Sequence, residues 1–129
     1  MNKIIVAGSI NMDVVARAHH HPQPGETVIG SDLHYFPGGK GSNQAVAANR
    51  LGGNVSLVGK LGKDAFGNSM SNFLKDEGLD LTHLTFSDTH PTGTALIIVN
   101  DQSENTIVVV PGSNTAVCPS SVSPLRVVP

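Results

Sequence analysis

The sequence is poor in cysteine, in net charge and in long apolar runs, and each shortage excludes a class of protein. Cys118 is the only cysteine among 129 residues, so no disulfide can form within the chain. The formal net charge of −2 gives no electrostatic basis for binding nucleic acid or an anionic membrane. No apolar run approaches the roughly 18 residues that a membrane-spanning helix needs, and the N-terminus lacks a signal-peptide pattern. We therefore expect a protein of the reducing cytoplasm.

Motifs that bind nucleotides or metals are also missing. A Walker A motif requires G-x-x-x-x-G-K-[ST], but Gly39-Lys40 is followed by Gly41. The dinucleotide fingerprint G-x-G-x-x-G fails because Gln44 occupies its last position. The histidines and acids show no zinc or calcium spacing. The triplet His19–His21 is expected to be a solvated loop, since three consecutive side chains cannot all face one ion.

The residues that are present predict a single α/β domain with an extra β layer. Hydrophobic residues make up 39% of the chain and charged residues 14%, which is typical of a soluble domain with a core. Along the chain, short apolar runs typical of strands alternate with segments whose apolar residues recur at helical spacing. Strands are expected at 3–9, 14–18, 25–30, 32–36, 54–59, 80–86, 92–100 and 104–110, and helices at 42–51 and from the N-cap residue Asp64 to Gly78.

A glycine-rich turn, Gly38–Gly41, leads directly into the first expected helix. Glycine lets the backbone approach a ligand closely, and the start of a helix offers unpaired N–H groups and the positive end of a dipole. Lys40 adds a cation, and Asn43 adds a donor and an acceptor in the first turn. These groups could bind a polyhydroxylated or anionic small molecule, and they could equally do no more than start a helix.

Two polar residues, Asn11 and Asp13, come after the first expected strand, in the loop where ligands bind in open α/β sheets. A turn or cap role for Asp13 is the alternative. Taken with Lys40, Asn43 and the exposed backbone of Gly39, these groups suit the vicinal hydroxyls of a sugar. A carboxylate accepts hydroxyl protons, whereas amide and ammonium groups donate. This chemistry predicts sugar binding but does not specify a reaction.

Several segments together resemble the ribokinase-like family of carbohydrate kinases, which includes the fructose and adenosine kinases. The resemblance lies in Gly8-Ser-Ile-Asn-Met-Asp13, Pro24-Gly-Glu-Thr27 and Gly38-Gly-Lys-Gly-Ser-Asn-Gln-Ala-Val-Ala-Ala48, with later matches at Thr92–Ile97 and Pro111–Asn114. It covers roughly residues 2–116, and the Lys40 form of the glycine turn favours the ribokinase members. It implies a parallel-sheet sandwich with a small β lid, formed by strands around 14–36 and 92–110.

The resemblance also implies a function. In such kinases the γ-phosphoryl group of ATP is transferred to a sugar hydroxyl, in ribokinases the 5-hydroxyl of D-ribose, with Mg²⁺ and a monovalent cation such as K⁺. By resemblance, Asn11, Asp13, Gly39, Lys40 and Asn43 would contact the sugar. The lids of two subunits often pair in a homodimer, and neither nucleic acid nor membrane is a partner.

The chain differs from the family in length and in its C-terminal part. Family members are more than twice as long, and their second half carries the nucleotide site and a Gly-Ala-Gly-Asp motif with the catalytic aspartate. No Gly-x-Gly-Asp occurs here, so no catalytic, cofactor-binding or metal-binding residue is assigned. We expect residues 1–116 to be the N-terminal part of such a domain and residues 117–129 to be an irregular tail, left by a truncation or a frameshift. The chain alone is expected to be inactive. The alternatives are a non-catalytic sugar-binding module, an inert gene fragment, or part of a kinase for another sugar or a nucleoside.

Overall fold

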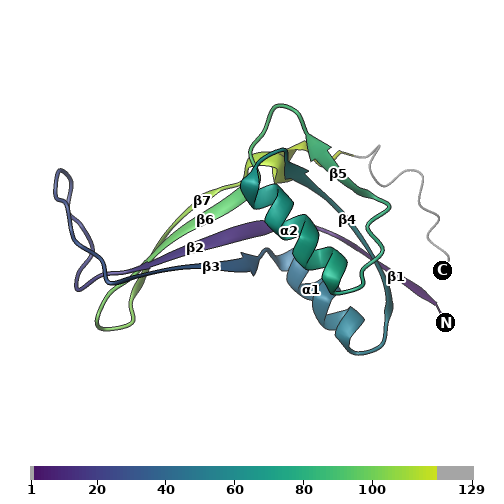
Figure 1. The fold of residues 1–129 in the computed structure, drawn as a ribbon, viewed down its shortest axis with the longest axis horizontal. Helices are drawn as coiled ribbons and strands as arrows, with labels where there is room; N and C mark the ends of the chain where they lie inside the picture. The colour runs from purple at the N-terminus through teal and green to yellow at the C-terminus, as the bar shows by residue number, and fades with distance from the viewer. Residues whose placement is uncertain (1, 119–129) are drawn as a thin grey trace.

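The structure, a computed structural model, describes residues 2–118 and contains two β-sheets flanked by helices (Figure 1). A parallel sheet has the strand order β1 (Lys3–Ala7), β4 (Asn54–Gly62), β5 (Leu84–Ser87). A second sheet, here called the lid sheet, has the order β3 (Asp32–Gly38), β2 (Asn11–Arg17), β6 (Gly93–Val99), β7 (Asn105–Val110). The helices are α1 (Lys40–Arg50), α2 (Ala65–Asp76) and the short 3-10 helix η1 (Gly112–Ala116). Most of the expected tail, residues 119–129, lies outside the described residues.

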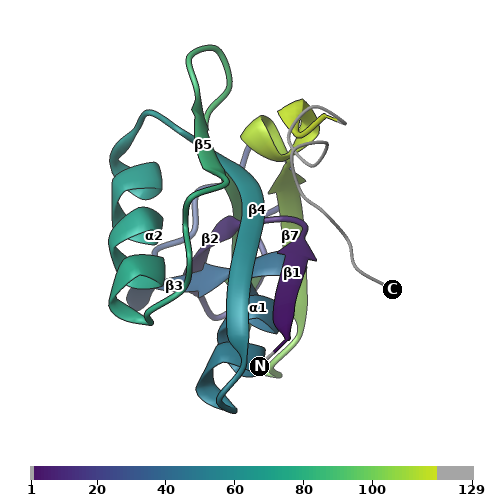
Figure 2. The same ribbon diagram turned by 90° about the vertical axis from the view of Figure 1, so that its right-hand side faces the viewer.

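The core lies between both α-helices and one face of β4. Side chains of a strand alternate between its faces, so Val55, Leu57 and Leu61 point the same way. All three are buried in one cluster with Ala45 and Val46 of α1 and with Met70 and Leu74 of α2. Figure 2 shows α2 on one side of β4 and η1 on the other. The η1 side is fixed by a hydrogen bond of 2.8 Å from Ser113 Oγ to the carbonyl of Lys60.

The ends of both helices are set by local sequence. Gly39 precedes α1 with φ of 98°, and Gly52 comes after it with φ of 94°, a left-handed conformation that favours glycine. Asp64 caps α2 as predicted, because its Oδ1 accepts the N–H of Gly67 at 2.8 Å. The same carboxylate accepts the N–H of Thr92 at 2.9 Å and its hydroxyl at 2.6 Å. Asp64 therefore joins the start of α2 to the start of β6.

The lid sheet projects from the helical body, with its hairpin turns at the far end (Figure 1). Its central strand β2 pairs antiparallel with β3 and parallel with β6, and β6 pairs antiparallel with β7. The hairpin predicted at 92–110 is thus confirmed, and the two lid segments predicted from the resemblance form one sheet. Large apolar side chains stay exposed on it, among them Leu33, Tyr35, Phe36, Leu96 and Ile107–Val110.

Three local predictions were wrong. Residues 25–30 form no strand; instead the Glu26 carboxylate accepts the N–H of Gln23 in a turn. The strand expected at 54–59 continues through Lys60–Gly62, because these residues pair in parallel with β5. The strand expected from residue 80 begins at Leu84, and Asp80 makes only an isolated bridge to Ser56.

Replacing the cap residue, Asp64→Ala, is expected to lower the free energy of unfolding by about 2 kcal/mol, since it removes the helix cap and the partners of Thr92. Burial raises the pKa of Asp64, but the hydrogen bonds from Thr92 and Gly67 outweigh it and hold that pKa below its ordinary value. The stabilisation is therefore present above about pH 4 and is lost as the pH falls through the lowered folded-state pKa. Urea unfolding at pH 7 and at pH 3 measures both effects.

The matched control for this substitution is Asp76→Ala, at the exposed end of the same helix. We expect it to leave stability within about 0.5 kcal/mol of the unaltered chain. Equal stability of Asp64→Ala and the unaltered chain would contradict the assigned cap, as would a difference between them that does not change with pH.

Candidate functional site

The candidate site forms where the loop between β1 and β2 meets the glycine turn before α1. The two backbones touch, since a Cβ on Gly41 would lie 2.5 Å from the carbonyl carbon of Gly8. A Cβ on Gly39 would lie 2.5 Å from the carbonyl oxygen of Ser9 and 2.8 Å from Cα of Ile10. Any larger side chain at these positions would separate the two segments. This contact brings the start of β2 to the start of α1.

Most of the first N–H groups of α1 are hydrogen-bonded within the protein, so the expectation of unpaired N–H groups is met only in part. Ser9 Oγ accepts the N–H of Lys40 at 3.1 Å, and the Ser9 carbonyl accepts the N–H of Ser42 at 3.0 Å. The hydroxyl of Ser42 donates back to the carbonyl of Gly38 at 2.5 Å. The bonds to Ser9 occupy the N–H groups of Lys40 and Ser42, two of the donors that could hold a phosphate at a helix start. The local geometry therefore does not favour an anion site there.

Asn11 and Asp13 lie in strand β2, not in the loop that the sequence suggested. Being two residues apart, they point to the same face of the lid sheet. Asn11 pairs with Gly38, and a Cβ on Gly38 would lie 2.6 Å from both carboxylate oxygens of Asp13. Asp13 thus rests against the backbone of the glycine turn. Its partial burial raises the pKa of its carboxyl above the ordinary value.

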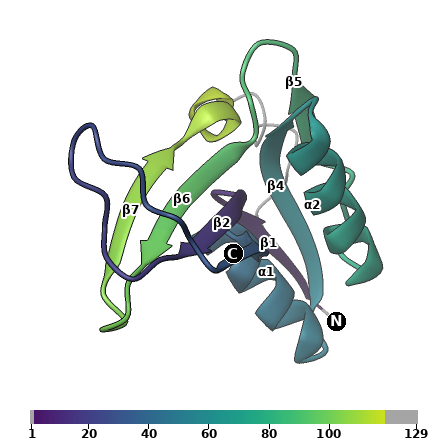
Figure 3. The same cartoon turned by 60° about the vertical axis from the view of Figure 1, so that its left-hand side comes forward.

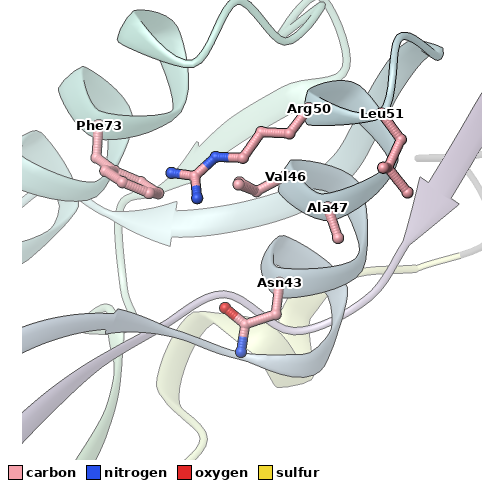
Figure 4. A pocket seen from close by; sticks show the side chains of 6 residues that line it. All are labelled: Asn43, Val46, Ala47, Arg50, Leu51 and Phe73. Atoms are coloured by element: carbon pink, nitrogen blue, oxygen red, sulfur yellow. The ribbon is translucent and has the colours of Figure 1, made fainter.

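Lys40 and Asn43 begin the same helix, but their side chains are exposed and make no hydrogen bond within residues 2–118. The structure therefore brings Asn11, Asp13 and Gly39 into one cluster and leaves Lys40 and Asn43 at its border. Asn43 also stands at one end of a shallow groove of about 560 Å³ between α1 and α2, at the opposite end from Phe73 (Figure 4). The groove is lined by Asn43, Val46, Ala47, Arg50, Leu51 and Phe73. It is mostly apolar and excludes Asp13, so we place the site at Asp13 and not in the groove.

The sequence analysis missed Asn114, which contacts the site from η1. Its Nδ2 lies 2.8 Å from Oδ1 of Asn11, although 103 residues separate the two in the chain. Figure 3 shows η1 beside β6 at the end of the lid sheet nearest β4. The segment Pro111–Asn114 belongs to the family resemblance, but nothing in its sequence indicates that Asn114 bonds to Asn11.

The histidine triplet lies in a loop, and each of its three side chains contacts a different residue. His19 Nδ1 lies 2.8 Å from Asp101, His20 Nε2 lies 3.2 Å from Glu26, and His21 Nδ1 lies 3.0 Å from Thr106. The Asp101 hydrogen bond raises the pKa of His19. Residues 2–118 contain no group of three or more histidine, cysteine or acidic residues able to hold a metal ion. No helix within this range has the length and apolar character needed to cross a membrane.

Comparison with known proteins gives one consistent family. A sequence model described as "pfkB family carbohydrate kinase" matches residues 1–123. The chain is 45% identical to a ribokinase of Lactococcus lactis over 97% of this chain and 41% of that protein. It is 42% identical to a ribokinase of Bacillus subtilis, over 93% of this chain and 41% of that one. It thus spans about two fifths of the length of these relatives.

A solved structure shows the same fold. The Arabidopsis thaliana ribokinase complexed with ribose and ATP superposes with a TM-score of 0.82 at 33% identity, over 86% of this chain and 36% of that one. Because the family match extends over nearly the whole chain, the assignment does not depend on any single motif. The chain belongs to the pfkB family of carbohydrate kinases and corresponds to the N-terminal part of its ribokinase members.

Proposed function

We propose that this chain is the sugar-binding part of a ribokinase, an enzyme that transfers the γ-phosphoryl group of ATP to the 5-hydroxyl of D-ribose. The observation that carries the proposal is the cluster of Asn11 and Asp13 on one face of β2, with the Asp13 carboxylate against Gly38 and the backbone of Asn11 against Gly39. An amide and a carboxylate set side by side can donate to one sugar hydroxyl and accept from another. Relatives at 42–45% identity are ribokinases, and one solved relative was complexed with ribose and ATP.

Lys40 and Asn43 are proposed to complete the sugar contacts from α1. Both side chains are exposed at the border of the cluster, where a bound sugar could reach them. Because Ser9 takes the N–H groups of Lys40 and Ser42, the start of α1 offers fewer donors to an anion, which favours a neutral ligand over a phosphate. This separates the role of the glycine turn from that of a phosphate loop.

We assign no site for the ATP, Mg²⁺ or K⁺ of such a reaction to the residues described. They include no cluster of metal-ligating side chains, and the chain contains no phosphate-loop motif and no Gly-x-Gly-Asp. Phosphoryl transfer depends on positioning and on stabilising developing charge. We therefore assign sugar binding to this chain and no step of the transfer itself.

The lid sheet is proposed to pair with the lid of a second copy. The face that carries Asp13 also carries Phe36, Ile107 and Val109, each at least 50% exposed. Exposed apolar side chains on a sheet face mark an interaction surface, and although the opposite face carries others such as Tyr35 and Val108, we choose this face because it also carries the proposed sugar site. A second copy of that same face would bury them and cover the sugar from above, which excludes water from the site.

Titration with D-ribose, followed by calorimetry, should show saturable binding to the 129-residue chain. Asp13→Asn is expected to weaken it about 10- to 100-fold, because hydrogen bonds to a charged group contribute about 1.5–3 kcal/mol. Since burial raises the pKa of Asp13, binding should begin to fall at a higher pH than for an ordinary aspartate. Asp32→Asn, the same change at the exposed far end of β3, should leave affinity unchanged.

A folded chain that ignores D-ribose would refute the proposed sugar site. Stronger binding of fructose or adenosine than of ribose would keep the site and change its substrate. In the presence of ATP, Mg²⁺ and K⁺, we expect this chain alone to phosphorylate ribose far more slowly than the 1–100 s⁻¹ that is roughly typical of kinases. Turnover within that range would contradict the assignment of catalysis to residues outside this chain.

Sedimentation equilibrium tests the lid pairing. The unaltered chain should sediment as a dimer, and Ile107→Glu should give a monomer because it places a charge in the proposed apolar interface. The control is Val108→Glu, which changes an equally exposed neighbour on the opposite face of β7 and should leave the dimer intact. A monomeric unaltered chain, or dissociation by Val108→Glu alone, would overturn this choice of face.

A further inference from the structure

Asn114 reaches from η1 to the first residues of β2 and makes three hydrogen bonds there. Its Oδ1 accepts the backbone N–H of Ile10 at 2.9 Å. Its Nδ2 lies 3.2 Å from the backbone carbonyl of Ile10 and 2.8 Å from Oδ1 of Asn11. One side-chain amide thus satisfies both backbone groups of one residue and the side chain of the next.

The backbone N–H of Ile10 determines which atom of Asn114, and then which atom of Asn11, is the donor and which the acceptor. A backbone N–H can only donate, so the atom of Asn114 that faces it must be the oxygen. The nitrogen of Asn114 must then face the carbonyl of Ile10 and the side chain of Asn11. Since that nitrogen can only donate, the atom of Asn11 that meets it must be the oxygen. The remaining atom of the Asn11 amide is its NH₂ group, which has no hydrogen-bond partner within residues 2–118.

The absent side chain of Gly93 makes room for this arrangement. Gly93 opens β6 and pairs with Asn11 in the parallel register. A Cβ at Gly93 would overlap Nδ2 of Asn114 and would lie 2.5 Å from Oδ1 of Asn11. The hydrogen-bonded pair therefore occupies the space that any other residue would fill. Three segments, β2, β6 and η1, are shaped around one amide-to-amide bond.

We propose that Asn114 is a positioning residue that locks the Asn11 amide with its NH₂ group presented to the sugar. The inference rests on the proposed sugar-binding function of Asn11. The NH₂ group that the locked amide presents to the ligand can donate but cannot accept, whereas the neighbouring Asp13 carboxylate can only accept. The two side chains thus form a fixed donor–acceptor pair on one strand face. A ligand must offer a hydroxyl lone pair to Asn11 and a hydroxyl proton to Asp13.

The test replaces the donor of Asn114 by an acceptor of the same shape. In Asn114→Asp the carboxylate still accepts the N–H of Ile10, but Asn11 must turn its NH₂ group inward and present its oxygen to the sugar. At pH 7 the affinity for D-ribose should fall at least about tenfold. As the pH is lowered, protonation of the new carboxyl restores a donor toward Asn11. The ratio of wild-type to variant affinity should therefore shrink between pH 7 and pH 4.5. The control is Asn68→Asp, at an exposed position of α2, whose ratio should stay at one throughout.

Two results from the titration would overturn the proposal: unchanged ribose affinity in Asn114→Asp, or a loss of affinity that does not vary with pH. The second would mean that Asn114 serves only the local fold.

Nuclear magnetic resonance of the side-chain amides in the unaltered chain provides a second measurement, which needs neither a variant nor a sugar. The NH₂ protons of Asn114 should exchange slowly with solvent and those of Asn11 quickly. The reverse order of exchange would refute the locked orientation even if the variant does not fold. The expected order in a chain that binds no ribose would refute the sugar site and uphold only the locked orientation of the Asn11 amide.

Discussion

The site depends on the direct contact between two stretches of backbone, Gly8–Ile10 and Gly38–Gly41. No side chain separates them, and the carbonyl and hydroxyl of Ser9 bond to the first N–H groups of α1. Strand β1 of the parallel sheet ends just before this contact, and strand β2 of the lid sheet begins just after it. The position of α1 against β4, the direction of β2 and the placing of Asp13 therefore share one origin. A chain with a larger residue at Gly39 or Gly41 could keep its helices and still lose this geometry.

The same contact decides what kind of ligand suits the site. A glycine turn that opens a helix usually suggests an anion, because its N–H groups point outward. Here Ser9 of the neighbouring loop accepts two of those N–H groups, those of Lys40 and Ser42, so fewer donors are left for an anion. The groups left on the surface are an amide, a carboxylate and, at the border, Lys40 and Asn43. Such a mixture of donors and acceptors matches hydroxyl groups better than phosphate.

Sequence patterns predicted those parts of the fold that depend on neighbours in the chain. Both helices, the cap at Asp64 and the hairpin turn at Asn100–Ser103 are explained by periodicity, turn residues and capping chemistry. The patterns failed where distant segments decide. Asn11 and Asp13 read as loop because they come after a strand and a glycine, yet pairing with β3 and β6 makes them a strand. Residues 25–30 carry Thr, Val and Ile between two glycines, as a short strand would, but have no partner strand to pair with among the described residues. Asn114 could not be predicted because its partner lies 103 residues away in the chain.

The lid sheet is held at one end only. Its base is joined to the body by the glycine contact, by Asp64 bonding Thr92, and by η1 beside β6, whereas its tip is closed by exposed pairs such as His19 with Asp101. In mechanical terms the sheet is a cantilever, which is fixed near Asn11 and free at the histidine loop. Bending spreads along the strands, so displacement is largest at the tip and smallest at the fixed end. Bending of the sheet would therefore move the histidine loop far more than Asn11 and Asp13, which lie next to the fixed end.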